Sequence, residues 1–400
     1  MFKHKKWFGT SAFVLIVVAL AACAAPAAPT VAPAPTPAPA PTVAPVPATA
    51  APASPTVAPA PTTAPAAGPI VITDALGRAV KFDKLPQRIV LTGRAFFMII
   101  DALYLFPEAT ARVVGLPDTT QSKNDFFAAL DPNYASKFII RGSNEAGPEQ
   151  IAPVNPDVVI TKSVNASRLG KSLEQVNIPV VYVDFETPEQ YSRDLAILGQ
   201  LLGNPERAKM IDAYFKTQVE RVNAKIKNLK DADKPRVLLL QYSEKSGTVA
   251  FSIPPVEWMQ TLIVEMAGGR SIWRENAGKG GWSVVNLEQI AAWNPDQVYI
   301  VFYGGDPKDA IAKIKADPKW QALKAVKENK VFGFPGDFYT WDQPDTRWGL
   351  GLIWLAAKTH PALFGDVNIN QEIARFYALY GFDQAAIRSK VTPLLVGDLK

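Results

Sequence analysis

The chain has 400 residues, a formal net charge of +5, one cysteine and two histidines. This length exceeds what one hydrophobic core usually serves, so two lobes with additional segments are expected. The weak positive charge gives no support for nucleic-acid binding, and a single cysteine excludes an internal disulfide framework and a cysteine-based metal site.

Residues 1–22 have the pattern of a secretory signal peptide. Basic residues at 3–6 precede a short apolar core that is too short to span a membrane. The core ends in Leu-Ala-Ala-Cys at residues 20–23, which resembles the lipobox of bacterial lipoproteins. We therefore expect Cys23 to be lipidated, with an ordinary signal peptide and an incidental cysteine as the alternative. Loss of the three lysines in this segment would leave a net charge of about +2, from +5 less three.

Residues 23–69 are expected to form a spacer behind the lipidated cysteine. Residues 24–69 contain proline, alanine, threonine and valine throughout, and no Asp, Glu, Lys or Arg. Such a composition cannot bury a core and is typical of polyproline II, which would extend to roughly 140 Å at about 3.1 Å per residue. A glycosylated stalk or a partner-binding proline motif are the alternatives.

The next segment, residues 70–203, alternates predicted strands and helices. Strands are expected within 70–82, around a Leu76-Gly77 turn, and at 88–91, 112–116, 158–161 and 179–183; helices are expected at 96–105 and 190–202. This alternation favours a parallel sheet, which binds ligands at the carboxyl ends of its strands. Residues that follow predicted strands are Arg94, Ser163, Asn165 and Asp184.

Residues 204–229 predict one long amphipathic helix. Asn204 is a suitable N-cap and Pro205 suits the first helical position. Glu206 places a negative charge near the N-terminus, where the helix dipole stabilises it. Apolar residues recur every three or four positions along it, at 211, 215, 219, 222, 226 and 229.

The last part of the chain, residues 231–400, again mixes strands and helices. Strands are predicted at 235–241, 296–302 and 330–334, and helices at 257–267, 286–292 and 345–360.

A short internal repeat flanks the long helix. Residues 149–160 read EQIAPVNPDVVI and residues 288–299 read EQIAAWNPDQVY. Each copy predicts a short helix, an Asn-Pro-Asp turn and an apolar strand. The repeat therefore indicates two similar lobes joined by the long helix, although so short a match can also arise by chance.

Several motifs in this order resemble one protein family. The first motif is TDALGRAVKFDKLPQRIVLTGRAFFMIIDAL, which begins at residue 73. It is followed by the EQI…PDVVI segment, the long helix, the second copy of the internal repeat and WDQPDTRWGLGLIWLAAKTHP. Together they resemble the bacterial periplasmic binding proteins for iron complexes and cobalamin, the substrate receptors of ABC importers. The resemblance implies an α/β fold with two Rossmann-like lobes, mainly parallel sheets and one long connecting helix.

The resemblance also implies an organisation and a set of partners. The expected parts are a signal peptide (1–22), a spacer (23–69), an N-terminal lobe (70–203), a connecting helix (204–230) and a C-terminal lobe (231–400). The partners would be an ABC permease and its ATPase, a metal chelate, and the membrane through the lipid anchor, with no nucleic acid. The protein would act as a monomer at the outer face of the cytoplasmic membrane, without a cofactor.

Aromatic and arginine side chains near predicted strand ends are the ligand-binding candidates. Rigid rings can cover a large conjugated ligand, and guanidinium groups pair with carboxylates or phenolates. The candidates are Arg94, Tyr242, Trp282, Tyr303, Tyr339, Trp341 and Arg347. Plain packing is the alternative for each aromatic residue, and a surface ion pair is the alternative for each arginine.

Glu149 and Glu288 occupy equivalent places in the two repeat copies. In the family, an acidic residue on each lobe meets arginines of the permease, so the resemblance makes these two the docking candidates. The alternative is that each glutamate only stabilises its own helix through a favourable interaction with the helix dipole.

Catalytic and bare-metal functions find little support. The sequence contains no G-x-S-x-G, P-loop or H-E-x-x-H motif. Bare transition metals prefer several His or Cys ligands, and His360, which is expected to cap or pack a helix, is the one histidine after the signal peptide. We therefore expect the protein to be a receptor and not an enzyme. A ferric siderophore ranks first as its ligand, a corrinoid second and haem third. In the haem case Tyr242 or Tyr303 would be the axial ligand. The alternative is a lipid-anchored enzyme or a sensory or adhesive head.

Overall fold

The computed structural model describes residues 69–118, 126–142 and 146–399. The predicted signal peptide, Cys23 and all of the spacer except its last residue lie outside these residues. Residues 64–400 form one compact unit that holds every described helix and strand together with its own hydrophobic core. We call residues 69–203 the first lobe and residues 231–399 the second lobe.

A five-stranded parallel sheet forms the centre of the first lobe, in the order β5-β4-β3-β6-β7. All residues of β3, β6 and β7 are buried, as expected for a parallel sheet covered on both faces. The strands are β3 (Ile89–Leu91), β4 (Val113–Pro117), β5 (Phe138–Ile140), β6 (Val158–Lys162) and β7 (Val180–Val183). The helices are α1 (Phe97–Leu103), α2 (Ala109–Arg112), α3 (Phe126–Leu130), α4 (Pro148–Ile151), α5 (Lys171–Gln175) and α6 (Pro188–Leu202).

A separate hairpin of β1 (Ile70–Thr73) and β2 (Ala79–Phe82) precedes this sheet. Its turn is held by Asp74, whose Oδ1 accepts hydrogen bonds from the backbone N–H groups of Leu76 (3.0 Å) and Arg78 (3.1 Å). The Arg78 guanidinium pairs with Asp74 Oδ2 at 2.8 Å, and Gly77 supplies the left-handed φ of +75° that the turn requires. These contacts explain why the sequence has Asp, Gly and Arg at this spacing.

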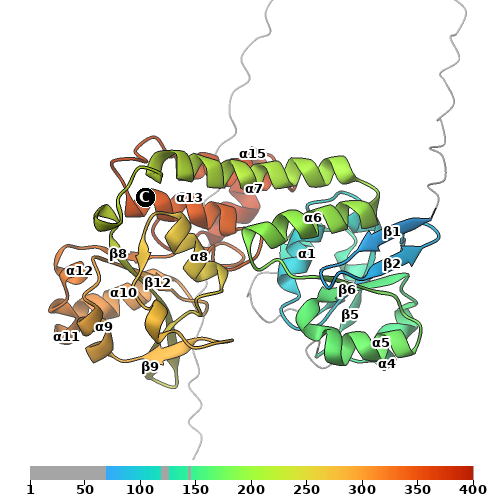
Figure 1. Ribbon diagram of the computed structural model, residues 1–400, viewed down its shortest axis with the longest axis horizontal. Coiled ribbons are helices and arrows are strands. Elements are labelled where there is room, and N and C mark those ends of the chain that lie inside the picture. The colour runs from blue at the N-terminus through green and yellow to red at the C-terminus, as the bar shows by residue number, and fades with distance from the viewer. Residues whose placement is uncertain (1–68, 119–125, 143–145, 400) are drawn as a thin grey trace, which may run out of the picture. The chain divides into compact units, whose positions relative to one another are not determined.

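The long helix α7 (Pro205–Ile226) connects the two lobes and packs on α6 of the first lobe and on α13 (Trp348–Thr359) of the second (Figure 1). As predicted, Asn204 is its N-cap, and the side-chain Oδ1 accepts a hydrogen bond from Arg207 N at 3.0 Å. The helix ends three residues before the predicted residue 229. Its 22 residues span about 33 Å at about 1.5 Å per residue.

The second lobe contains a mixed sheet, in the order β11-β9-β8-β12-β13, with β10 also pairing with β8. Strands β8, β12, β13 and β10 are parallel to one another, whereas β9 pairs antiparallel with β8 and β11 pairs antiparallel with β9. The strands are β8 (Arg236–Lys245), β9 (Thr248–Ile253), β10 (Arg270–Ser271), β11 (Ser283–Val285), β12 (Gln297–Val301) and β13 (Val331–Gly333).

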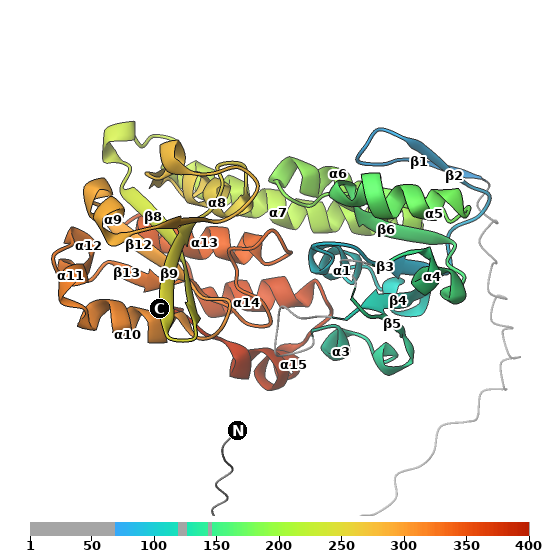
Figure 2. The same cartoon turned by 90° about the horizontal axis from the view of Figure 1, so that it is seen from below.

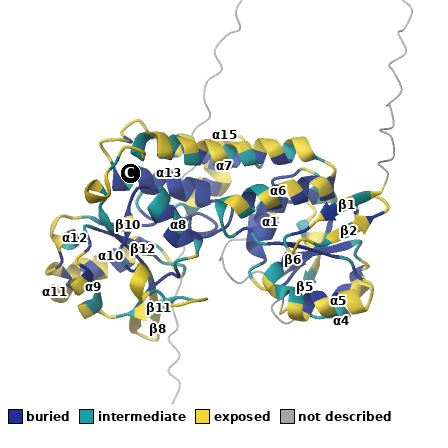
Figure 3. Cartoon of the chain, viewed as in Figure 1, coloured by how far each residue is buried: buried dark blue, intermediate teal, exposed yellow. Residues whose placement is uncertain are grey.

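The other helices of this lobe are short, except for the buried α13. Figure 3 shows buried residues concentrated in α13 and in the strands, as expected from the apolar sequence of that helix. Figure 2 shows the same elements from below. The helices are α8 (Met259–Met266), α9 (Leu287–Trp293), α10 (Pro307–Ala316), α11 (Pro318–Gln321), α12 (Lys324–Lys327), α14 (Ile369–Ala378) and α15 (Gln384–Ala386).

The internal repeat has the same local structure in both lobes. Asn155 and Asn294 adopt left-handed φ angles of 48° and 44° between the helix and the strand of each copy. The backbone N–H of Asp157 donates to the Arg88 carbonyl, and that of Asp296 donates to the Arg236 carbonyl, each at 2.8 Å. The two Asn-Pro-Asp turns therefore join equivalent strands, β6 to β3 and β12 to β8.

One expected strand end is wrong. Strand β8 was predicted to end at Gln241, but it continues to Lys245 and turns directly into β9. Ser246 and Gly247, with φ angles of 50° and 79°, form the two-residue hairpin turn. Tyr242 therefore lies within a strand and not in a loop.

The shared turn geometry generates a stability prediction. Replacing Asn294 with alanine should lower the free energy of unfolding by about 1 kcal/mol. The left-handed conformation costs alanine about 1–2 kcal/mol, whereas the polar side chain of asparagine offsets part of this cost through local hydrogen bonds. Asn294→Gly should change it by less than about 0.5 kcal/mol. Urea denaturation of residues 64–400 measures both, and Asn155 should behave in the same way. Equal stabilities of the alanine and glycine variants would contradict the structural account of the repeat.

Candidate functional site

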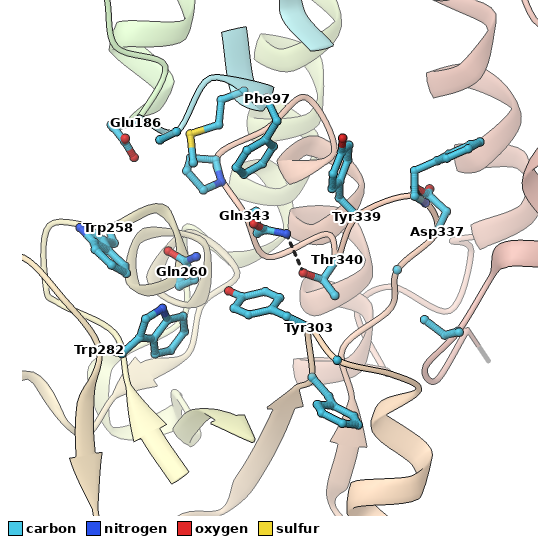
Figure 4. A pocket seen from close by; sticks show the side chains of 18 of the residues that line it. Phe97, Glu186, Trp258, Gln260, Trp282, Tyr303, Asp337, Tyr339, Thr340 and Gln343 are labelled. Atoms are coloured by element: carbon cyan, nitrogen blue, oxygen red, sulfur yellow. Dashed lines mark hydrogen bonds between the residues drawn. The ribbon is translucent and has the colours of Figure 1, made fainter. Parts of the chain in front are cut away.

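A cavity of about 1010 Å³ lies between the two lobes (Figure 4). The first lobe contributes residues that follow β3, end β6 or follow β7, as the rule for parallel sheets predicts. The second lobe contributes the loops after β12 and β13, the start of α8, the segment before β11 and the C-terminal segment. Side chains that line the cavity include Arg94, Phe97, Met98, Lys162, Val164, Glu186, Trp258, Gln260, Trp282, Phe302, Tyr303, Tyr339, Gln343, Leu394 and Val396.

The turn between β3 and α1 presents Arg94 to the cavity. Gly93 has a φ of +101°, and a Cβ atom at this position would lie 2.5 Å from Thr161 Oγ1, so only glycine fits. Asn165 Oδ1 accepts a hydrogen bond from Arg94 N at 3.3 Å, and Asn165 Nδ2 donates to Thr161 Oγ1 at 2.9 Å. The exposed Arg94 guanidinium has no hydrogen-bond or ion-pair partner among the described residues and is available to a ligand.

A second cation of the first lobe is Lys162, the last residue of β6. Its Nζ forms an ion pair with Glu186, which follows β7, and lies 3.0 Å from Met98 Sδ. Lys162 is almost fully buried, so its charge is held inside the wall of the cavity.

Aromatic rings from both lobes line much of the cavity. Trp282 lies edge-on to Trp258, with ring centroids 5.9 Å apart, and to Tyr303, with centroids 6.1 Å apart. Phe97 of the first lobe stacks on Tyr339 of the second at 5.2 Å. Figure 4 shows Phe97 and Glu186 on one side of the cavity and Trp282 and Tyr303 on the other. Such walls suit a large apolar or conjugated ligand.

Tyr303 is held by a buried carboxylate. Its hydroxyl donates to Asp342 Oδ2 at 2.7 Å, and Gln260 Nε2 also lies 3.4 Å from this oxygen. Burial raises the pKa of Asp342 above its ordinary value, and burial together with the Asp342 charge raises the pKa of Tyr303 well above its ordinary value. Tyr303 is therefore a neutral phenol whose proton is directed at Asp342.

Behind the aromatic wall lies a buried ionic network centred on Arg347. Its Nη1 lies 2.5 Å from Asp101 Oδ2 of the first lobe, and its Nε donates to Asp337 Oδ1 of the second. Asp345 Oδ2 lies 3.6 Å from the same Nη1. Burial raises the pKa of Asp101 to about 7 and that of Asp345 well above its ordinary value, although Arg347 opposes both shifts.

Arg347 and Trp341 support the cavity wall and do not line it, so their prediction as ligand contacts is corrected. Both side chains are fully buried. Trp341 Nε1 donates to Asp337 Oδ2 at 3.0 Å, and the Arg347 guanidinium lies 5.1 Å from the ring centre of Tyr339. Because Asp337 and Tyr339 belong to the lining loop, the two buried residues fix its position.

Tyr242 is also outside the cavity lining. Its hydroxyl donates to Glu244 Oε2 at 2.7 Å, and its ring packs edge-on against Phe302, a lining residue, at 5.0 Å. The position within β8 places its ring behind the cavity wall. Of the predicted ligand contacts, the structure brings together Arg94, Trp282, Tyr303 and Tyr339.

Glu149 and Glu288 lie in the first turns of α4 and α9 and are exposed. Neither lines the cavity, and neither forms an ion pair with a described residue. Figure 1 shows α4 and α9 on the side of the two lobes that is opposite α7.

His360 caps the end of α13, as expected. Its Nε2 lies 3.2 Å from the Gly268 carbonyl oxygen, and burial lowers its pKa. Among the described residues there is no group of three or more His, Cys, Asp or Glu side chains placed to hold a metal ion.

The sequence analysis missed several lining residues. Lys162 directly precedes the candidate Ser163, and Glu186 lies two residues after the candidate Asp184. The rule that ligands bind at strand ends could therefore have found both. Leu394 and Val396 come from the C-terminal segment, which pairs with Gly336 through an isolated bridge. No sequence signal marks that return of the chain.

Comparisons with known proteins agree on one family. Residues 89–338 match the family model described as periplasmic binding protein. The molybdate-binding protein MolA of Haemophilus influenzae is 25% identical over 331 residues, which cover 77% of this chain and 89% of that protein. The iron-uptake system-binding protein of Bacillus subtilis is 25% identical over 189 residues, which cover 46% of this chain and 56% of that protein.

Solved structures show the same fold. A periplasmic solute-binding protein from Veillonella parvula matches with a TM-score of 0.66 and 24% identity, over 82% of this chain and 100% of that chain. Molybdate-bound MolA from Haemophilus influenzae matches with a TM-score of 0.59 and 19% identity, over 78% and 98% of the two chains. In the part of the chain that the structure describes, no helix has both the length and the apolar character needed to cross a membrane.

The buried network generates a pH prediction. The pKa of Asp101 is about 7 in the folded protein, above its value of about 3.9 in an unfolded chain, so the folded state binds the proton more tightly. The stability that comes from the protonated Asp101 carboxyl group is fully present below about pH 4 and is lost as the pH rises to about 7. The free energy of unfolding of the wild type relative to Asp101→Asn should therefore fall over this range, by up to a few kcal/mol.

Urea denaturation at a series of pH values measures this difference. Asp83→Asn, which removes an exposed carboxylate of the first lobe, is the matched control and should show little pH dependence relative to the wild type. A difference between wild type and Asp101→Asn that stays constant from pH 4 to pH 7 would contradict a raised pKa at Asp101.

Proposed function

The chain belongs to the periplasmic binding protein family, and we propose that it is the substrate-binding component of an ABC importer that captures a chelated metal between its lobes. One observation carries the proposal: the cavity of about 1010 Å³ combines aromatic walls with the guanidinium of Arg94. A ligand of that size and mixed character would be held by ring contacts and by charge pairing.

The cavity supports a metal complex over a bare ion. A bare transition metal is held by several closely placed donor side chains, and the described residues contain no such group. A small oxyanion would leave most of the cavity to water. A metal already enclosed in an organic ligand needs only surface contacts, so ferric siderophores rank first, corrinoids second and haem third.

The names of relatives support the class and leave the ligand open. They include an Fe(3+)-citrate-binding protein of Bacillus subtilis, 22% identical over 257 residues, and a vitamin B12-binding protein of Pectobacterium carotovorum, 26% identical over 179 residues. Together with MolA, these relatives are named for quite different metal-containing solutes.

The placement of the protein in the cell is part of the proposal. Lipidation at Cys23 would anchor the protein at the outer face of the cytoplasmic membrane, and the spacer would let the two lobes reach the permease. A homologue from Methanocaldococcus jannaschii, 23% identical over 296 residues, is named a lipoprotein. The protein would work as a monomer with a permease and its ATPase.

The carboxylates available for an anchored enzyme are already engaged. Asp184 pairs with Arg193 at 2.7 Å, Asp337 pairs with Arg347, and Asp342 accepts from Tyr303. These contacts favour structural roles and support the receptor function over catalysis.

Ligand titration tests the proposal. Residues 64–400 are mixed with ferric siderophores, cyanocobalamin and haemin, while the visible absorption and tryptophan fluorescence are recorded. One coloured complex should quench the fluorescence saturably at one site. Failure of every complex to bind would overturn the chelated-metal assignment.

Variants connect this binding to the cavity. Trp282→Ala should weaken the bound complex about tenfold or more, because a central aromatic side chain contributes about 1.4 kcal/mol or more to binding. Phe138→Ala removes an aromatic ring that is exposed on the edge strand β5, outside the cavity, and should leave the affinity unchanged. Equal effects of the two substitutions would contradict the site.

Permease docking is tested by charge reversal. Glu149→Arg and Glu288→Arg should each reduce cellular uptake of the bound complex at least about tenfold, because like charges would meet across the interface. Both should leave ligand affinity within about twofold, since neither residue lines the cavity. Glu220→Arg on the exposed face of α7 is the control. Normal uptake with both docking variants would end this part of the proposal.

A further inference from the structure

The Lys162–Glu186 ion pair lies in the wall of the cavity and joins two very different partners. The Lys162 side chain is 3% exposed, whereas the Glu186 side chain is 36% exposed. Lys162 is the last residue of β6 and pairs in register with Val183 of β7, so its backbone is fixed by the sheet. The Lys162 ammonium group therefore lies inside the wall, whereas the Glu186 carboxylate reaches water.

The loop that carries Glu186 is shaped for this position. Phe185 has a left-handed φ of 56°, which is unusual for a residue with a Cβ atom, and its buried ring packs on Tyr191. The backbone N–H of Glu186 donates to Gln190 Oε1 at 2.9 Å. The backbone of Glu186 is thus held in place, while its side chain extends into the cavity (Figure 4).

A buried ammonium group needs an anionic acceptor, because desolvation without one is costly. In this structure Glu186 supplies the anion. The other carboxylates that line the described cavity have different partners: Asp306 accepts from the backbone N–H groups of Lys308 and Gly397, and Asp337 pairs with Arg347.

We propose, resting on the receptor function above, that Lys162 is an anion subsite for the ligand and that Glu186 is its exchangeable counterion. An anionic oxygen of the ligand replaces the Glu186 carboxylate on Lys162 Nζ, and the released carboxylate turns into water. Arg94 adds a second cation on the same wall. The site therefore selects ligands with at least one carboxylate or similarly charged oxygen over neutral ligands of the same size.

The exchange makes opposite predictions for the two partners. Lys162→Met keeps an unbranched side chain that is one atom shorter and removes the charge. It should therefore weaken anion binding roughly tenfold or more, as expected for a lost charge-assisted hydrogen bond. Glu186→Gln removes the competing anion and should strengthen anion binding roughly threefold or more. A residue that only stabilised the wall would weaken binding in both variants.

The test uses the aromatic sulfonate 1-anilinonaphthalene-8-sulfonate as an anionic probe and Nile red as a neutral one. Both are titrated by fluorescence into residues 64–400 of the wild type, Lys162→Met and Glu186→Gln. Lys171→Met and Glu220→Gln, which remove exposed charges from α5 and α7, are the matched controls. The affinity for the sulfonate should fall in Lys162→Met, rise in Glu186→Gln and stay unchanged in the two controls. The affinity for Nile red should stay unchanged in all of them.

Unchanged sulfonate affinity in Lys162→Met, weaker sulfonate binding by Glu186→Gln, or no sulfonate binding by the wild type would each overturn the inference. If Lys162→Met loses cooperative thermal unfolding, Glu186→Gln alone decides the outcome. These probes contain no metal, so the result is independent of the chelate titration. A protein that passes this test but binds no chelate retains its anion subsite and loses only the proposed metal ligand.

Discussion

The guanidinium of Arg347 lies fully buried between Asp101 of the first lobe and Asp337 and Asp345 of the second. Desolvating these charges is expensive, and the energy returns only if the ion pairs stay intact. The Asp101 contact joins residues that are 246 positions apart. The network therefore couples the packing of the two lobes to the loop that carries Tyr339. The shape of the cavity thus depends on an Arg347–Asp101 contact that lies outside the cavity lining.

The helix α7 adds a second constraint on the relation between the lobes. It packs on α6 and on α13, and the buried Phe215 stacks on Trp348 at 5.0 Å. A continuous helix cannot bend as a flexible crossover does, so closure around a ligand is expected to involve small shifts at the lobe interface. Local changes such as the movement of the Glu186 side chain then account for more of the adaptation to a ligand than a large hinge motion.

The sequence predicted those parts of the fold that follow local rules. The Asn-Pro-Asp repeat, the N-cap at Asn204 and the buried strands all depend on residues close in the chain. Arg94 and Tyr303 line the cavity, in agreement with the rule that strand ends form sites in parallel sheets. Arg347 and Trp341 were misplaced because their burial depends on Asp101 and Asp337, and no local pattern reveals a partner so distant in sequence. Tyr242 was misplaced because a two-residue turn at Ser246 and Gly247 extended its strand.

Native mass spectrometry tests the claim that the cavity between the lobes carries a metal complex. The protein would be purified from its own cells without added ligand, under conditions that preserve non-covalent binding, and the released solute analysed for metal content. We predict one equivalent of a metal-containing organic complex per chain, with a lower occupancy in the Trp282→Ala variant. A stoichiometric adduct that contains no metal would contradict the claim.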